Sequence, residues 1–465
     1  DAEGLAGKQS EFRDELNITN LVVEYDLGWA GLLSSSAWVD GDNNFNQDQS
    51  SFGGQPVPLL LGAAVDTFSQ ELRLVSQSET QLQYVAGIFY EEIELNGNQS
   101  LWGSTDETVD FLLGAFGLPS NPFGDESHQL TQDSFNKNVD HQLSFYGELA
   151  YSFNEQLELT LGARRFDYER SFRNINTGIF GSGDNSSAFE ESGTNMKANL
   201  SYQPNEGTLL YAQWAEGFRL GNAVIPPPSA TCDVNNDGIL DGTIAPIRDG
   251  FDSDTTENIE LGAKLTLLED RLQINAAVYR VDWQGVPLSV LGGKLSTQPA
   301  QICFGSSIIN AGEARSQGFE LEAVYQLTQS LRASIGGAYT NAELTVDALA
   351  LGGVSGDRLP SSPDYNANFA LQYEFEVGGH ASYVGGDYAY VSHFYNKLGE
   401  TGIETGGYGQ LNMSAGISFN SFSLELFGRN LTNEDALTHA DILLSDNRAY
   451  QLRPRTVGMN VSYQF

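Results

Sequence analysis

The sequence predicts an all-β chain that folds as an antiparallel β-barrel crossing a membrane. Three observations predict this fold: strands that alternate between apolar and polar residues, connections that alternate between short and long, and 50 Gly, 20 Tyr and 26 Phe among 465 residues. Successive side chains of a strand point to opposite faces, so a wall between lipid and a wet lumen needs this alternation on every strand. A closed barrel also pairs every backbone polar group, as lipid requires.

The C-terminal ten residues show the alternation most cleanly. Val457, Met459, Val461, Tyr463 and Phe465 fall on one face, and the residues between them are Gly or polar. A period of two indicates a strand with one apolar face, which a soluble antiparallel sheet could also provide. The ending formed by Val461, Tyr463 and Phe465 resembles the signal that outer-membrane barrels present for insertion, which implies the barrel assembly machinery as a partner.

Similar segments recur along the whole chain, and we predict about seventeen strands. The first eight are predicted at 13–25, 28–40, 66–76, 81–94, 138–151, 156–172, 192–202 and 208–218. The other nine are predicted at 256–267, 271–283, 316–327, 330–344, 364–377, 381–394, 409–419, 422–432 and 452–465.

One predicted strand, 271–283, breaks the alternation. Its apolar residues change face part-way, with Leu272, Ile274 and Val278 on one face and Tyr279, Val281 and Trp283 on the other. An extra residue in one strand of a pair shifts the face of everything after it. A β-bulge near Ala276 or Ala277 is therefore expected.

The connections differ in length according to a simple rule. Short turns fall near 154–155, 204–206, 269–270, 328–329, 378–379 and 420–421, and long loops near 41–65, 95–137, 219–255, 284–315, 345–363, 395–408 and 433–451. Outer-membrane barrels have short periplasmic turns and long extracellular loops. A soluble sandwich or propeller has no reason to separate them in this way.

Charge and hydropathy exclude other classes. The formal net charge is −38, and nucleic acid is excluded as a partner because binding phosphate needs a basic face. No apolar run approaches the roughly 20 residues that a membrane helix needs.

The number of strands indicates that the barrel is incomplete. If the last of about seventeen alternating strands ends at the periplasmic rim, the first one runs from the outer rim to the periplasmic rim. A complete barrel has an even number of strands and starts at the periplasmic rim, so an odd number of strands would be missing before the first one.

Short motifs along the chain resemble those of the TonB-dependent outer-membrane receptors. In order they are FSQELRL (68–74), YVAGIFY (84–90), YAQWAEGFRLG (211–221), ENIELGAK (257–264), NAGEA (310–314), GFELE (318–322), RLP (358–360), GRNLTN (428–433) and RPRT (453–456). Each motif is weak alone, but their order and spacing are specific, and together they cover nearly the whole chain.

The resemblance implies a barrel of about 22 strands with an N-terminal plug. Residues 1–465 would then be the receptor's barrel domain with about five strands absent. Nothing in the chain resembles the plug or the segment that contacts the periplasmic TonB-type energy coupler. The implied function is energised uptake of a scarce nutrient across the Gram-negative outer membrane, with an iron-siderophore complex as the leading cargo and cobalamin, haem or oligosaccharide as others. A passive porin and an outer-membrane enzyme remain alternatives.

One loop carries a candidate calcium-binding pattern. Asp233, Asn235, Asp237 and Asp241 occupy positions 1, 3, 5 and 9 of an EF-hand-type loop, and Gly follows Asp237. Ile244 stands where such a loop has its bidentate Glu. The alternative is an acidic, Asn- and Gly-rich turn without an ion. Apart from this candidate calcium, no cofactor is expected.

The only two cysteines, Cys232 and Cys303, lie in consecutive long loops at the same rim. In an oxidising exterior two such residues can form a disulfide, and the alternative is two unpaired thiols.

The long loops are acidic. Residues 219–254 hold six Asp against two Arg, and residues 95–136 hold six acids and no Lys or Arg. This charge could attract cationic or metal-bearing ligands, but we favour a solvated rim that divalent ions bridge to anionic lipopolysaccharide. The five His show no metal-ligand spacing, and no hydrolase, metalloprotease, P-loop or Rossmann motif is present. The chain is therefore not expected to be an enzyme.

Overall fold

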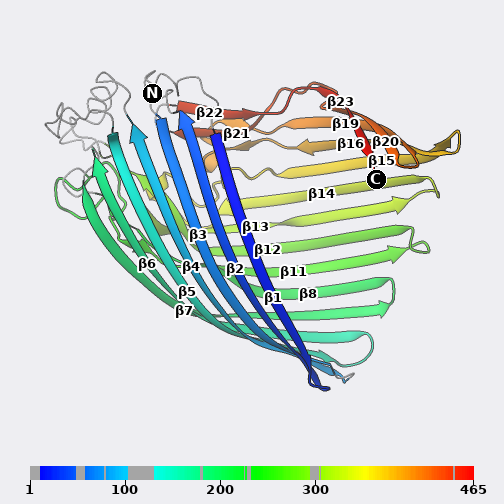
Figure 1. Ribbon diagram of the computed structural model, residues 1–465, viewed down its shortest axis with the longest axis horizontal. Helices are drawn as coiled ribbons and strands as arrows, with labels where there is room; N and C mark the ends of the chain where they lie inside the picture. Colours follow the sequence, from blue (N-terminus) through cyan, green and yellow to red (C-terminus); the bar gives the residue numbers. More distant parts are fainter. Residues whose placement is uncertain are drawn as a thin grey trace.

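The computed structural model describes residues 11–48, 58–77, 80–102, 130–178, 182–224, 226–227, 232–293, 303, 305–443 and 446–464. Most of them belong to one antiparallel sheet of 17 strands, joined in chain order (Figure 1). None of the described residues form a helix with the length and apolarity needed to cross a membrane.

Each of the seventeen predicted strands falls on one strand of this sheet. Its strands are β1 (Glu11–Asp26), β2 (Ala30–Asp48), β3 (Pro58–Ser76), β4 (Leu82–Trp102), β5 (Leu130–Ser152), β6 (Leu157–Gly178), β7 (Gly183–Asn205), β8 (Thr208–Arg219), β11 (Asp254–Leu267), β12 (Leu272–Leu291), β13 (Ser306–Gln326), β14 (Leu331–Leu344), β15 (Tyr365–Val377), β16 (His380–Val391), β19 (Tyr408–Phe419), β20 (Phe422–Arg429) and β23 (Thr456–Tyr463). The sequence therefore predicted the fold class and the strand order correctly.

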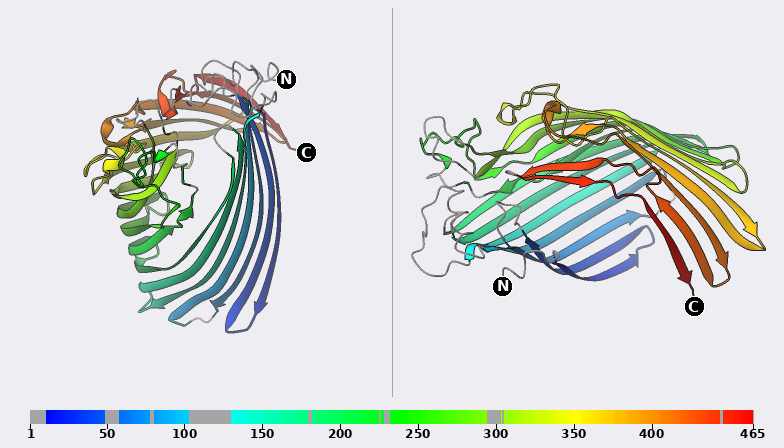
Figure 2. Two further views of the ribbon diagram at one scale, coloured as in Figure 1. Left: turned by 90° about the vertical axis from the view of Figure 1, so that its left-hand side faces the viewer. Right: turned by 90° about the horizontal axis from the view of Figure 1, so that it is seen from above.

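The sheet bends into a curved wall (Figure 2). Each strand pairs with its neighbours in the chain, and the two edges of the sheet are β1 and β23, which show no pairing with each other among the described residues. β1 starts opposite the far end of β2, so it runs from the long-loop rim to the short-turn rim, as the strand count predicted.

Short turns and long connections do lie at opposite rims, but the strands are longer than predicted. Six of the seven strands from β1 to β7 have 19 or more residues. A tilted strand spans a bilayer with roughly 9–11 residues. The predicted loops 41–65 and 95–137 are thus wrong in their bounds, because β2 to β5 continue beyond the membrane into them and leave only 49–57 and 103–129, which lie outside the described residues.

The remaining long connections contain small hairpins that the sequence did not reveal. These are β9 (Asn222–Ala223) with β10 (Gly250–Phe251), β17 (Phe394–Tyr395) with β18 (Glu404–Thr405), and β21 (Leu437–Leu443) with β22 (Asp446–Gln451). Two short 3₁₀ helices, Leu349–Leu351 and Leu398–Glu400, lie in the same region.

The apolar side chains of the strands project from the convex face. Along β11 every second residue from Thr255 to Leu261 is exposed and the residues between them are partly covered, because a curved sheet spreads side chains on its convex face and crowds them on its concave face. Leu261 is 55% exposed. Such apolar exposure is unfavourable in water and is what a lipid-facing wall requires.

Two aromatic rows lie on this convex face. The rings of Trp38, Phe68 and Tyr90 are in tilted contact across β2, β3 and β4, with centroids 5.4 and 6.4 Å apart. Phe319, Tyr339 and Tyr365 form a similar row across β13, β14 and β15, at 6.0 and 5.1 Å. Outer-membrane barrels place such girdles where the bilayer meets water.

The bulge predicted near Ala276 or Ala277 is absent. The register between β11 and β12 runs without interruption from Leu267↔Leu272 to Thr255↔Gln284, and the irregularity lies later, between Gln284 and Pro287, opposite β13. The apolar residues change face because β12 leaves the membrane. Its first half faces lipid on the convex side, whereas Trp283 packs from the concave side against a buried cluster formed by the outer ends of β12, β13 and β14 and by Ala348.

The last strand agrees with its predicted alternation. Val457, Met459, Val461 and Tyr463 are all exposed on one face of β23, opposite Gly428, Leu426, Leu424 and Phe422 of β20. Phe465, the end of the predicted insertion signal, lies outside the described residues.

Candidate ligand-binding face and loop core

The concave face carries a connected polar network on β3 and β5. The guanidinium of Arg73 donates to both carboxylate oxygens of Glu71, at 2.7 and 2.8 Å, and its Nε donates to the hydroxyl of Tyr146 at 3.2 Å. The Tyr146 hydroxyl in turn donates to Glu71. Glu71 and Arg73 belong to the FSQELRL motif, so this motif supplies polar groups to the concave face, whereas its Phe68 and Leu72 lie on the convex face.

Motif glycines on the same face make room for tyrosine rings. A Cβ on Gly262 would lie 2.2 Å from Cζ of Tyr211, whose ring crosses that position and whose hydroxyl donates to Glu260 at 2.6 Å. Gly87 is covered in the same way by the ring of Tyr146. A side chain at either glycine would displace the ring, which explains why the ENIELGAK and YVAGIFY motifs contain Gly at these places.

A cavity of about 490 Å³ opens on the wall formed by β3 to β8. Phe89, Arg164 and Asn195 line it, and Arg164 pairs across the strands with Asn195. Arg164 donates to Ser144 at 3.1 Å and lies 6.0 Å from the Phe89 ring centroid. Its Nε and the Asn195 Oδ1 are buried and find no partner among the described residues. The cavity thus offers one donor and one acceptor to a ligand or to water.

Arg219, Asp254 and Trp283 fix the base of the long loops. Asp254 is 3% exposed, and Arg219 donates to both of its carboxylate oxygens at 2.9 Å. The indole of Trp283 donates to the same carboxylate and lies 5.6 Å from the Arg219 guanidinium. This group joins β8, β11 and β12 where they leave the wall. Sequence analysis missed it, because the three residues are far apart in the chain.

Above this group the loops form a packed body of their own. Three buried clusters fill it: Val286, Ala314, Leu344 and Ala348; Ala245, Val290 and Ile309; and Cys232, Leu240 and Cys303. Asn310 ties two loops together, since its amide donates to the backbone carbonyls of Asp252 and Gly285 at 2.8 and 2.7 Å.

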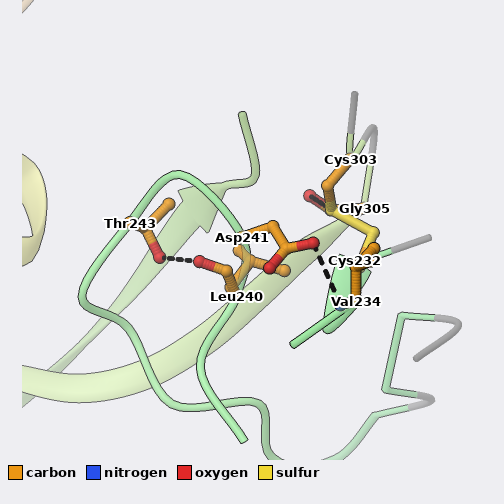
Figure 3. The surroundings of a disulfide bond; sticks show 7 residues. All are labelled: Cys232, Val234, Leu240, Asp241, Thr243, Cys303 and Gly305. Atoms are coloured by element: carbon orange, nitrogen blue, oxygen red, sulfur yellow. Dashed lines mark hydrogen bonds between the residues drawn. A yellow bond between two sulfur atoms is a disulfide. The ribbon is translucent and has the colours of Figure 1, made fainter. Parts of the chain in front are cut away.

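The two cysteines form a disulfide, one of the two alternatives that the sequence left open (Figure 3). Their Cα atoms are 4.7 Å apart and 71 positions separate them in the sequence. The bond joins the segment that contains the candidate calcium loop to the segment that leads into β13.

The candidate calcium residues form a tight turn next to this disulfide. Asp233, Asn235 and Asp237 are linked by hydrogen bonds within the turn, and Asp241 is buried behind them. In the described part of the chain, no three side chains drawn from His, Cys, Asp and Glu gather closely enough to hold a metal ion. Any ion in this loop would therefore need amide and backbone oxygens as well.

A second, smaller cavity of about 260 Å³ lies among the loops after β14 and β16. It is lined by the ion pair of Arg358 with Asp364 and by the contact of Glu404 with the His393 imidazole, whose Nδ1 lies 2.7 Å from the carboxylate. Tyr395 donates to Glu404 at 3.1 Å, and this hydrogen bond raises the pKa of the Tyr395 phenol. Arg358 of the RLP motif thus stabilises the loop after β14, because it binds Asp364 and the carbonyl of Ser362.

Comparison with known proteins decides the family. Residues 3–431 match the sequence profile described as "TonB dependent receptor-like, beta-barrel". The chain belongs to this family of TonB-dependent receptors. Members are outer-membrane proteins of Gram-negative bacteria that work as transport receptors, so the resemblance inferred from the motifs is confirmed.

Individual TonB-dependent receptors are similar at low identity. The metal-pseudopaline receptor CntO of Pseudomonas aeruginosa is 26% identical over 311 residues, covering 66% of this chain and 38% of that protein. The ferric yersiniabactin uptake receptor FyuA of Yersinia pestis superposes with a TM-score of 0.75 at 17% identity, covering 98% of this chain and 62% of FyuA. The copper transporter OprC superposes with a TM-score of 0.70 at 16% identity, covering 98% of this chain and 66% of OprC. The chain thus spans less than two thirds of these receptors.

Proposed function

We propose that this chain forms the wall and loops of an outer-membrane receptor that takes up a metal chelate, with an iron-siderophore complex as the leading cargo. The observation that carries the proposal is the family match over residues 3–431, together with a convex apolar face and a concave polar one. The names of similar receptors refer to ferric yersiniabactin, metal-pseudopaline and copper, which favours metal-bearing cargo over cobalamin or oligosaccharide.

The concave face offers charged and aromatic groups to a polar chelate. Arg164 and Lys197 line the larger cavity together with three acids, Glu71, Glu148 and Glu216, and Lys197 forms an ion pair with Glu148. Phe89 and Tyr146 supply aromatic faces. Cation and ring together suit a ligand that is both charged and unsaturated. The Nε of Arg164 and the Oδ1 of Asn195 are buried beside this cavity without a hydrogen-bond partner among the described residues, and a ligand that displaced their cover would satisfy them.

The membrane setting follows from the convex face. We place the aromatic rows at the outer interface of the outer membrane, with lipopolysaccharide beyond them. Polar residues of the convex face would lie there, such as Arg165, which pairs with Asp167, and His141, which lies beside the Glu92 carboxylate. Insertion through the barrel assembly machinery and coupling to a periplasmic TonB-type protein belong to the same proposal.

The test uses the complete receptor gene that encodes this chain. A deletion strain is grown under iron limitation with single siderophores as the iron source, and uptake of radioactive iron is measured with and without the coupling protein. We expect one chelate to restore growth only through the intact gene and only with the coupler. Uptake that needs no coupler would favour the passive porin, and growth on no iron chelate would exclude iron-siderophore cargo.

Uptake of other metals separates the remaining cargoes. The same strains are loaded with copper, zinc or nickel in place of iron, and the metal content of washed cells is measured. A gene-dependent gain of one of these metals, without a gain of iron, would support the receptor function and identify that metal, not iron, as the cargo.

A further inference from the structure

We propose that residues 233–241 bind one calcium ion, and that this ion and the disulfide next to it hold two loops of the long-loop rim together. The proposal concerns the loops only and does not depend on which chelate the receptor carries. It stands on the backbone of the turn, on a buried carboxylate without a counter-charge in the described part of the chain, and on the hydrogen bonds that join this turn to the disulfide.

The backbone of the turn is wound as a calcium loop requires. The Asp233 carboxylate accepts hydrogen bonds from the backbone N–H of Asp237 at 2.8 Å and of Gly238 at 3.1 Å. Asn236 and Gly238 have positive φ, 58° and 76°, and this local left-handed backbone turns the chain sharply. The side chains of positions 1, 3 and 5 are thereby brought into one turn.

The oxygens of this turn are close together. The Asn235 amide donates to the Asp237 carboxylate at 2.8 Å, and the other Asp237 oxygen accepts from the N–H of Ile239 at 2.9 Å. Two carboxylates and one amide oxygen thus lie within a five-residue turn. Calcium prefers ligands of this kind, and the backbone carbonyl at position 7 is a further oxygen in such loops.

Asp241, at position 9, supplies the independent observation. This residue is 5% exposed, and its carboxylate is turned toward the start of the loop, where one oxygen accepts from the N–H of Val234 at 3.2 Å (Figure 3). The other oxygen, Oδ1, is buried and has no hydrogen-bond partner among the described residues. A buried charge without a partner is strongly unfavourable, and a cation beside it would remove the cost.

Within the described residues, the carboxylates of this turn have no ion-pair partner, since none of the ion pairs that Lys, Arg or His form there includes Asp233, Asp237 or Asp241. The loop from Cys232 to Gly242 contains three Asp and no Lys or Arg. Because both cysteines are in a disulfide and no His is near in sequence, the donors are oxygens only, which suits calcium rather than zinc.

The missing ligand at position 12 sets the expected affinity. Ile244 is found there, 62% exposed, so no bidentate carboxylate completes the set. Calcium sites of extracellular modules bind with dissociation constants on the order of 10⁻⁴ to 10⁻³ M, and we expect this range.

Hydrogen bonds carry the effect of the ion to a second loop. The N–H of Asp241 donates to the carbonyl of Cys232 at 2.9 Å, and the carbonyl of Asp241 accepts from Gly293 at 2.8 Å. The carbonyl of Gly293 accepts from the N–H of Cys303 at 3.1 Å, and the disulfide links Cys303 back to Cys232. An ion at Asp241 therefore orders residues on both sides of the disulfide.

Calcium titration of the purified full chain in detergent micelles tests the proposal. After chelator treatment, calorimetry should show one calcium per chain with a dissociation constant in the stated range. Asp233→Asn and Asp241→Asn should each weaken binding at least tenfold. Asp249→Asn is the matched control, because Asp249 is an exposed acid in the same loop outside the turn, and it should bind as the unchanged chain does.

A second measurement keeps the test decisive if a variant folds poorly. Trypsin or proteinase K digestion is followed with 5 mM calcium, 5 mM magnesium or chelator, each at the ionic strength of the others. Calcium alone should slow cleavage of the loops severalfold, and Asp241→Asn should abolish that difference. Absence of saturable binding up to 10 mM calcium, or equal binding by Asp241→Asn and Asp249→Asn, would overturn the proposal.

Discussion

Asp254 lies buried at the base of the long loops, and Arg219 binds both of its carboxylate oxygens from the end of the neighbouring strand β8. The pair closes the seam between β8 and β11 where the wall ends and the loop body begins, because Asp254 and Arg219 are directly opposite in register. The loops are thus anchored to the barrel by a buried charge with a dedicated partner.

Breaking this anchor should destabilise the loops. Arg219→Ala leaves the Asp254 carboxylate without its guanidinium, and we expect a loss of about 2 kcal/mol in the free energy of unfolding. Arg219→Lys should recover only part of the loss, since an ammonium cannot bind two oxygens side by side. Urea unfolding in micelles, followed by tryptophan fluorescence, measures both. Equal stability of the Ala variant and the unchanged chain would contradict the anchoring role.

A charged substitution on the convex face should impair folding into lipid. Leu261→Arg places a charge on the apolar face of β11, and we expect it to cost about 2–4 kcal/mol in folding into lipid vesicles. Gln213→Arg is the matched control, because Gln213 lies on the concave face directly opposite Glu260. If both variants insert equally well, Leu261 does not face lipid.

Because the Tyr211 ring covers Gly262, substitutions at these two positions should have coupled effects on stability. Gly262→Ala would push a methyl group into the Tyr211 ring and should cost about 1–3 kcal/mol. In Tyr211→Ala the ring is gone, so the additional cost of Gly262→Ala should nearly vanish. Gly97→Ala serves as the control, because its added Cβ would meet no atom closer than 3.9 Å. Additive costs in the double variant would show that ring and glycine do not interact.

The disulfide predicts a loss of loop order on reduction. It closes a segment of 71 positions, and its removal should cost about 2–4 kcal/mol in the stability of the loop body. Cys232→Ser with Cys303→Ser, and the unchanged chain under reductant, should be cleaved in the loops at the same raised rate. Thiol titration of the unfolded chain without reductant should find no free thiol. One or two free thiols would be inconsistent with the bond.

Alternation and connection length, both properties of the sequence, determined the class of the fold and the number and order of its strands, and the order and spacing of short motifs indicated the family. These properties are local, because apolar and polar residues alternate along any strand that separates lipid from water, as they do from Val457 to Tyr463. The tertiary structure alone decided the length of the strands beyond the membrane, the cause of the change of face along β12, and the contacts of Arg219 with Asp254 and of Tyr211 with Gly262. Those features depend on which strands become neighbours and on where the wall leaves lipid, and no stretch of sequence contains that information by itself.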